Sequence, residues 1–121
     1  MVLSCGIDIE EINRFDKHYF QNGILSDLIY DIFTTREIEN YSYYGKKAFL
    51  KGFCFKEAFY KAINSLNISW CDIEILFTEN DYKIEPSALI TIEIAKKGIK
   101  KIDINFRETD QYIICTVLLL N

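Results

Sequence analysis

The chain has 121 residues, half of them hydrophobic, and this length and composition predict a single domain, residues 1–121, with a core of its own. The formal net charge of −4, with no basic tract to offset it, argues against a nucleic-acid-binding protein. The four cysteines show no paired short spacing, so we expect buried thiols in a reducing, cytoplasmic compartment rather than a zinc site or a disulfide framework.

Two features argue against a membrane protein. Charge begins at Asp8, before any apolar region develops, so we expect no signal peptide. The apolar run from Ile113 to Leu120 is too short to span a bilayer, and we therefore expect no membrane partner.

The first third of the chain predicts a buried strand followed by three helices. In chain order these cover residues 2–9, 10–20, 24–33 and 34–41. Asn22-Gly23 separates the first two helices. Thr34 or Thr35 caps the third helix, and Glu37 lies in its first turn.

The densest apolar helix is predicted over residues 44–64. Its hydrophobic positions nearly surround the helix axis, which is typical of a buried helix. They are Ala48, Phe49, Leu50, Phe53, Cys54, Phe55, Ala58, Phe59, Ala62 and Ile63. Gly52 lowers the helix propensity of this segment and indicates a close contact with its backbone.

The rest of the chain adds strands and one ambiguous segment. The strands and the turn are predicted at residues 72–77, 79–81, 101–106 and 112–120, the last two forming a hairpin. Residues 90–94 alternate as in a strand, yet Lys96-Lys97-Gly98 is a typical helix end, so we favour a helix over residues 88–97. The predicted class is α+β, an antiparallel sheet packed on a long central helix.

The first acidic segment follows the first strand. Asp8 and Glu10 share one face of that strand. If a helix begins at Glu10, then Glu10 and Glu11 simply favour its dipole. Asp8 is flanked by isoleucines, so we expect it to be half buried, and a buried carboxylate needs a partner or a metal.

The second charged segment interrupts the apolar central helix. Glu57 and Lys61 are four residues apart, and an ordinary helix salt bridge is the simplest interpretation. Charge in an otherwise apolar helix is costly, however, which favours a functional role. Asp8 and Glu57 together offer the hard oxygen ligands that Mg²⁺ prefers, and Lys61 can face phosphates bound to such a metal.

Basic side chains gather in two places. One group comprises Lys46, Lys47, Lys51, Lys56 and Lys61, and the other comprises Arg14, Lys17 and His18. Such groups bind phosphate-bearing ligands or acidic protein partners, although a solvated face is the commoner interpretation. His18, the one histidine of the chain, is expected to be structural.

Nearly the whole chain resembles the holo-acyl-carrier-protein synthase branch of the phosphopantetheinyl transferase superfamily. The segment Gly6-Ile7-Asp8-Ile9-Glu10-Glu11-Ile12-Asn13-Arg14 resembles its opening motif, Gly-x-Asp-Ile-x-Glu-Ile-x-Arg. The segment Phe33-Thr34-Thr35-Arg36-Glu37 resembles its Phe-Thr-x-x-Glu element, and Phe55-Lys56-Glu57-Ala58-Phe59-Tyr60-Lys61-Ala62 is similar to its second signature. Ser69 to Ile75 resembles the segment that follows in the family.

The resemblance implies the small phosphopantetheinyl transferase fold and a magnesium-dependent reaction. Such enzymes move phosphopantetheine from coenzyme A to a serine of an acyl or peptidyl carrier protein and release adenosine 3′,5′-bisphosphate. By resemblance, Asp8 and Glu57 are metal ligands, with Glu10 as a further acidic ligand. Glu57 and Lys61 are the expected catalytic residues, and Lys56 and Lys61 are expected to bind the cofactor.

The resemblance also implies partners. Arg14 matches a basic residue on the carrier-docking helix, and Lys17 lies one helical step further on. The short branch forms homotrimers with active sites between subunits, and its products serve fatty acid biosynthesis. We therefore expect an acyl carrier protein, coenzyme A and further copies of this chain as partners.

One family motif is missing. Where the family has a late Ser-His pair that contacts the cofactor, this chain has Asn105-Phe106-Arg107-Glu108. Arg107 offers a fork of donors suited to phosphate, so we expect it to bind the cofactor. The alternative is a diverged family member that binds a carrier protein or coenzyme A without transfer. The retained Asp8, Glu57 and Lys61 favour the enzyme.

Overall fold

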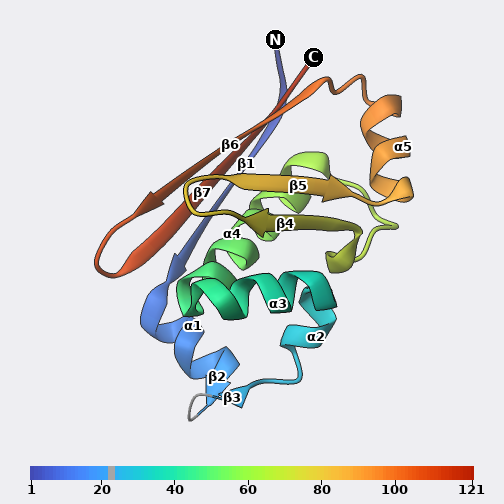
Figure 1. Ribbon diagram of the computed structural model, residues 1–121. Helices are drawn as coiled ribbons and strands as arrows, with labels where there is room; N and C mark the ends of the chain where they lie inside the picture. Colours follow the sequence, from blue (N-terminus) through green and yellow to red (C-terminus); the bar gives the residue numbers. More distant parts are fainter. Residues whose placement is uncertain (22–23) are drawn as a thin grey trace.

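The computed structural model describes residues 1–21 and 24–121 of the chain (Figure 1). Its elements, in chain order, are β1 (Val2–Glu11), α1 (Ile12–Tyr19), β2 (Phe20–Gln21), β3 (Ile24–Leu25), α2 (Ile29–Ile32), α3 (Thr35–Tyr44), α4 (Lys46–Ile63), the 3-10 turn η1 (Trp70–Asp72), β4 (Ile73–Phe77), β5 (Tyr82–Pro86), α5 (Ala88–Lys96), β6 (Lys101–Glu108) and β7 (Tyr112–Leu120). The class is α+β with antiparallel strands, as predicted.

Three long strands form the main sheet, in the order β1-β7-β6, with both pairs antiparallel. β4 and β5 form a separate hairpin. Figure 1 shows the helices and this hairpin gathered on one side of the three long strands. The long helix α4 packs against β1 and β7 and carries more buried residues than any other element, so the predicted sheet on a central helix is confirmed.

Glycines allow the close packing of α4. A Cβ at Gly6 of β1 would lie 1.9 Å from the backbone oxygen of Ala58, so only glycine fits where the strand crosses the helix. A Cβ at Gly52 would lie 2.7 Å from Tyr41 Oη, which is the close contact predicted at this position. β1 therefore runs along α4 at a separation that a larger side chain would prevent.

Two hydrogen bonds fix the direction of β1 along α4. Ser4 Oγ donates to the backbone oxygen of Ala62 at 2.6 Å, near the end of the helix. Cys54 Sγ donates to the backbone oxygen of Asp8 at 3.2 Å, two turns earlier. The strand therefore runs antiparallel to the helix, and Asp8 lies beside its second half.

The start of the first helix was predicted wrongly. Glu10 and Glu11 belong to β1, where they pair with Ile113 and Tyr112, and α1 begins only at Ile12. The backbone hydrogen bonds to β7 stabilise the extended conformation of Glu10 and Glu11 more than their helical sequence pattern favours a helix. The interpretation of Glu10 and Glu11 as helix-dipole acids is therefore wrong.

The predicted helix over residues 24–33 is also largely wrong. Residues 24–25 form a short strand and only Ile29–Ile32 are helical. Ser26 explains the interruption, because its backbone N–H donates to the backbone oxygen of Tyr19 and its hydroxyl accepts from the N–H of Leu28. The predicted break at Asn22-Gly23 lies outside the described residues.

The remaining elements follow the predictions more closely. Thr34 caps α3 with a capping box to Glu37, and the helix ends at Tyr44, later than predicted. The favoured helix over residues 88–97 is confirmed as α5, and the closing hairpin is confirmed as β6 and β7. β5 was not predicted. No helix of the described residues is long and apolar enough to cross a membrane.

The outer face of the main sheet carries exposed apolar side chains. Ile7 and Ile9 of β1 are 54% and 56% exposed. Their register partners Thr116 and Ile114 on β7 extend this face across the sheet. The helices pack on the opposite face, so a substantial apolar surface is left open in the single chain.

Candidate active site

Asp8 is the most unusual polar residue of the structure. It is only 7% exposed, and its Oδ2 atom is buried without a hydrogen-bond partner. Its other oxygen, Oδ1, accepts from Lys61 Nζ at 3.1 Å. A buried carboxylate oxygen without a partner costs free energy unless a cation or a ligand binds it, as predicted for this residue.

Glu10 and Glu57 lie close to Asp8. Burial first, and then hydrogen bonding to Asp8 and the charges of Asp8 and Glu57, together raise the pKa of Glu10 to about 8, while the charge of Arg14 opposes this rise. Burial, followed by the charge of Asp8, also raises the pKa of Glu57, while the charge of Lys61 opposes this rise. Three crowded carboxyl groups in a partly buried site favour binding of a cation.

These residues fit a magnesium ion. Mg²⁺ binds proteins through one or two carboxylates and completes its shell with waters and substrate phosphates. Oδ2 of Asp8 is available as such a ligand, and Glu57 and Glu10 lie beside it. Among residues 1–21 and 24–121 no three His, Cys, Asp or Glu side chains converge to hold a metal ion, so a magnesium ion here would rely on one or two carboxylates and on ligands outside the protein.

Lys61 pairs with Asp8 rather than with Glu57. Its ammonium donates to Asp8 Oδ1 and, at 3.0 Å, to the backbone oxygen of Ile7. Its side chain is 53% exposed, so the ammonium is accessible to a ligand at the same time. Among the described side chains, Lys61 therefore forms its ion pair with Asp8 and no ordinary helix salt bridge with Glu57.

Lys56 is wholly buried, and its ammonium lies 2.7 Å from Glu37 Oε1. It also donates to the backbone oxygens of Ile32, Trp70 and Ile73 at 3.1, 2.7 and 2.9 Å. Since its donors are taken by the protein interior, the prediction that Lys56 binds the cofactor is corrected. It points 100° around the helix from Glu57, because consecutive helical residues differ by that angle.

Comparisons with known proteins identify the family of this chain. Residues 4–117 match the family model of the 4′-phosphopantetheinyl transferase superfamily. The chain is 34% identical over 113 residues to the holo-[acyl-carrier-protein] synthase of Geotalea daltonii, covering 84% of this chain and 85% of that protein. This chain belongs to the 4′-phosphopantetheinyl transferase superfamily.

Further matches place it in the holo-acyl-carrier-protein synthase branch of these transferases. The synthase of Latilactobacillus sakei is 36% identical over 90 residues, which cover 71% of this chain and 74% of that protein. The crystal structure of the synthase from Neisseria meningitidis has the same fold, with a TM-score of 0.84, 20% identity and full coverage of both chains. The Helicobacter pylori synthase, solved in complex with coenzyme A, has a TM-score of 0.74 at 21% identity, over 96% of this chain and 99% of that one.

Of the two predicted docking residues, Arg14 lies beside the acidic site. Arg14 and Lys17 are both exposed on α1. Arg14 lines a cleft of about 280 Å³ together with Glu10, Tyr19 and Phe53. Tyr19 was not singled out from the sequence; its pKa is raised by burial and then by the charges of Glu10 and Glu57, which places it next to the carboxyl groups.

Arg107 is not brought to Asp8 within one chain. On the central strand β7, Cys115 pairs with Asp8 of β1 on one side and with Phe106 of β6 on the other. Arg107 is the residue after Phe106 on β6, two strands away from Asp8. Asp8 faces α4, whereas Arg107 is exposed on the opposite face of the sheet, because side chains alternate along a strand. Its predicted contact with the cofactor stays a prediction.

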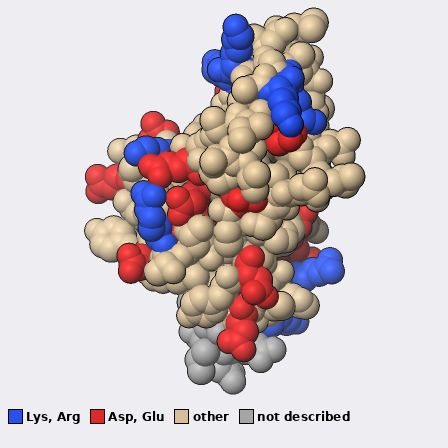
Figure 2. Space-filling view, turned by 90° about the vertical axis from the view of Figure 1, so that its right-hand side faces the viewer, with Lys and Arg blue, Asp and Glu red and all other residues tan. Residues whose placement is uncertain are grey.

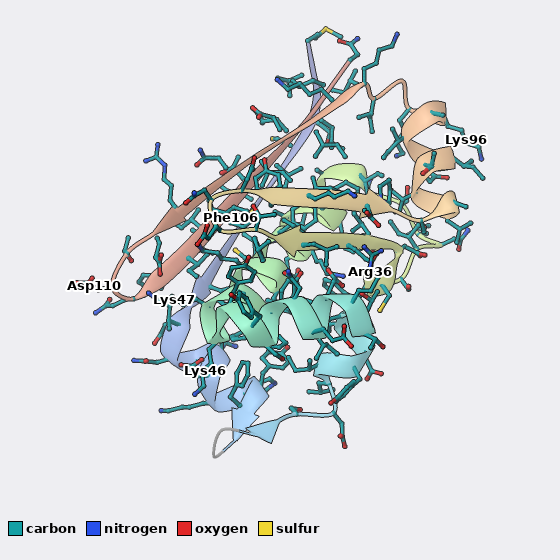
Figure 3. The ribbon with its side chains drawn as sticks, in the orientation of Figure 1. Arg36, Lys46, Lys47, Lys96, Phe106 and Asp110 are labelled. Atoms are coloured by element: carbon teal, nitrogen blue, oxygen red, sulfur yellow. The ribbon has the colours of Figure 1, made fainter. Side chains whose placement is uncertain are left out.

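A second cleft contains two of the predicted lysines. It measures about 530 Å³ and lies between the first half of α4, the β4–β5 turn and β6. Lys47 and Lys51 line it beside Tyr44, Tyr82 and Phe106 (Figure 3). Glu79 and Asp81 line the same cleft and balance the two lysines, so the feature that suits a nucleotide is the group of aromatic rings beside lysine side chains.

Proposed function

We propose that this chain transfers 4′-phosphopantetheine from coenzyme A to a serine of an acyl carrier protein, with Mg²⁺ as cofactor. The observation that carries the proposal is the buried, unpartnered Oδ2 of Asp8, next to Glu57 and within the same site as the accessible ammonium of Lys61. The family to which the chain belongs supports the same chemistry.

The reaction is a displacement at phosphorus. The serine hydroxyl oxygen of the carrier forms a bond to the phosphorus that bears pantetheine, and the bond from that phosphorus to the bridging diphosphate oxygen breaks. Adenosine 3′,5′-bisphosphate leaves with the bridging oxygen, and the hydroxyl proton passes to a base. Atoms and charge balance without a further reactant.

Asp8 and Glu57 would hold the metal, with Glu10 as a further acidic ligand. A bound Mg²⁺ supplies positive charge to the diphosphate oxygens. Lys61 supplies a second positive charge beside Asp8, where negative charge on the leaving group is stabilised. Glu57 would act by holding the metal against the diphosphate, at a position where burial raises the pKa of its carboxyl group above the ordinary value.

The cleft next to β6 is a candidate site for the nucleotide half of coenzyme A. Lys47 forms an ion pair with Glu108 at 2.6 Å at this cleft, and Lys51 lies one helical turn further along α4. The cleft lies at the first half of α4, whereas Asp8 lies at the second half. A site formed between two copies of the chain would bring both parts to one ligand.

A homotrimer is therefore part of the proposal. The open apolar face of the main sheet, with Ile7 and Ile9, supports burial against other copies. Sedimentation equilibrium tests this: wild type should give three times the chain mass, and Ile7→Asp should give smaller species. A monomeric wild type would contradict the trimer.

Carrier docking is assigned to α1. Acyl carrier proteins of this kind are acidic; Arg14 and Lys17 are both exposed on α1, and Arg14 lines the cleft that contains Glu10. We also propose that the chain acts in the cytoplasm, in fatty acid biosynthesis. Figure 2 shows acidic and basic side chains interspersed on one face, without the continuous basic field that nucleic-acid binding requires.

The alternative is a family member that binds without transferring. Phe106 stands in the Asn105-Phe106-Arg107 segment and packs against Phe77 and Tyr82, so this position offers an aromatic ring instead of a histidine donor. Intact-mass spectrometry decides between the two. An apo carrier incubated with the chain, coenzyme A and Mg²⁺ should gain the mass of one phosphopantetheine. Binding of carrier or coenzyme A without that gain would support the alternative.

A further inference from the structure

The buried ion pair of Lys56 and Glu37 connects α4 to several other elements. Both side chains are fully buried, and Nζ lies 2.7 Å from Oε1. The same ammonium bonds backbone oxygens at the end of α2, in η1 and at the start of β4, through Ile32, Trp70 and Ile73. One side chain of α4 therefore holds the helix to four separate segments.

Glu37 is equally well bonded. Its Oε1 also accepts from the backbone N–H of Thr34 at 3.0 Å. Its Oε2 accepts from Tyr41 Oη and from the backbone N–H of Ile75, each at 2.9 Å. A buried ion pair adds little stability compared with apolar side chains of similar volume, so stability is a weak reason for its presence. Its geometric specificity is the stronger reason.

The ion pair acts on the side of α4 opposite to β1. Lys56 and Ala58 are two residues apart, which places them about 200° apart around the helix. The backbone of Ala58 touches Gly6 of β1, where a Cβ would lie 1.9 Å from the Ala58 oxygen. α4 is thus held on one side by β1 and on the other by Glu37. Glu57 lies between these two contacts.

Small rotations of α4 would matter for Glu57. Side-chain ends lie about 5 Å from the axis of a helix, so a rotation of about 10° moves them by roughly 0.9 Å. A displacement of about 1 Å in a catalytic group can lower the rate on the order of 10²-fold. The approach of Glu57 to Asp8 therefore depends on the rotation of α4.

We propose that Lys56 and Glu37 are positioning residues: their ion pair fixes the rotation of α4 and so holds Glu57 at the distance from Asp8 that metal binding requires. The inference rests on the function proposed above, since it concerns the same site. Neither side chain touches the substrate, because both are enclosed by the protein. Their effect reaches the site only through the backbone of α4.

The test removes the ion pair without leaving a buried charge. Lys56→Met alone leaves Glu37 unpaired in the interior and can prevent folding. Lys56→Met combined with Glu37→Gln removes both charges at similar side-chain volume, and we expect this variant to fold. Mn²⁺, which takes the same oxygen ligands as Mg²⁺, is titrated into wild type and variant, with free Mn²⁺ followed by electron paramagnetic resonance.

We expect the double variant to bind Mn²⁺ about 10-fold or more weakly, the usual effect of removing groups that orient metal ligands. With Mg²⁺, its kcat for phosphopantetheine transfer should fall by roughly 10²-fold. The control is Ile90→Ala or Ile90→Val on α5, whichever matches the loss in thermal midpoint. Ile90 is fully buried in the core and makes no part of the ion-pair network.

The outcomes separate the two hypotheses. Weaker Mn²⁺ binding in the double variant and normal binding in the Ile90 control support positioning. Equal Mn²⁺ affinity and equal kcat in the folded double variant overturn it and leave the proposed function in place. An equal loss in both variants also overturns it, because general destabilisation would then explain the effect. A wild type that neither binds Mn²⁺ nor modifies a carrier overturns the proposed function and this inference together.

Discussion

Gly6→Ala should disturb the candidate site from the side of β1. The added Cβ would lie 1.9 Å from the backbone oxygen of Ala58, about 1.5 Å short of the ordinary contact distance of 3.4 Å. The neighbour is helix backbone rather than a flexible side chain, so β1 and α4 must separate. Overpacking of this kind costs about 1–3 kcal/mol, and occasionally more. For a chain of this size that lowers the thermal midpoint by roughly 4–12 °C.

The separation also moves Asp8 away from Glu57, because Asp8 lies two residues along the same strand. We therefore expect Mn²⁺ affinity to fall more in Gly6→Ala than in an Ile90 variant of equal thermal midpoint. Calorimetric melting and Mn²⁺ titration measure the two effects on the same samples. A Gly6→Ala variant with the melting temperature and metal affinity of wild type would refute the steric argument and the crossing geometry behind it.

Four further outcomes follow from the site. Asp8→Ala should abolish transfer in a carrier mass assay and leave the thermal midpoint nearly unchanged, because losing the ion pair with the half-exposed Lys61 is offset by removing a buried, unpartnered oxygen; normal turnover at limiting Mg²⁺ would contradict the metal assignment. Arg14→Glu should lower the association rate with an acidic carrier and flatten its salt dependence in stopped-flow measurements, with coenzyme A binding unchanged as the control. Arg107→Ala should weaken coenzyme A binding by roughly 1.5–3 kcal/mol in calorimetry, and equal affinities would place Arg107 outside the site. The pKa of Glu10 is raised to about 8, so the folded protein binds more protons than the unfolded chain between the ordinary value of 4.5 and about 8. Stability of the metal-free protein should therefore fall as pH rises through this window, and Glu10→Gln should reduce the slope of the thermal midpoint against pH.

The elements that were predicted well are those with a strong local signal. The apolar residues surrounding α4 and the capping pair of Thr34 and Glu37 each specify their structure within a few residues. The helix predicted over residues 24–33 failed because Ser26 bonds to Tyr19 at the end of α1, a contact that no local pattern reveals. Glu10 and Glu11 were misassigned for a similar reason, since their strand partners lie about a hundred residues away.

The candidate site shows the same division. Asp8 was expected to be half buried because of its isoleucine neighbours, and the structure buries it further, to 7% exposure. Its meeting with Glu57 and Lys61 depends on the crossing of β1 over α4, so only the family resemblance predicted it. Tyr19 has no distinguishing sequence pattern, and its place beside Glu10 and Glu57 became visible only in three dimensions.

Each of the two signature motifs, residues 6–14 and 55–62, contains residues proposed to act in the reaction and residues that hold the strand and the helix in place. Because side chains alternate along β1, Gly6 and Asp8 share the face toward α4. Gly6 allows the strand to lie close to the helix, and this close packing brings Asp8 near Glu57. Along α4 the 100° step sends Lys56 into the interior and leaves Glu57 at the site. Lys56 is thus the sequence neighbour of the proposed metal ligand Glu57, yet its side chain lies in the protein interior. The spacing within each motif therefore reflects the packing of one strand against one helix as well as the proposed metal site.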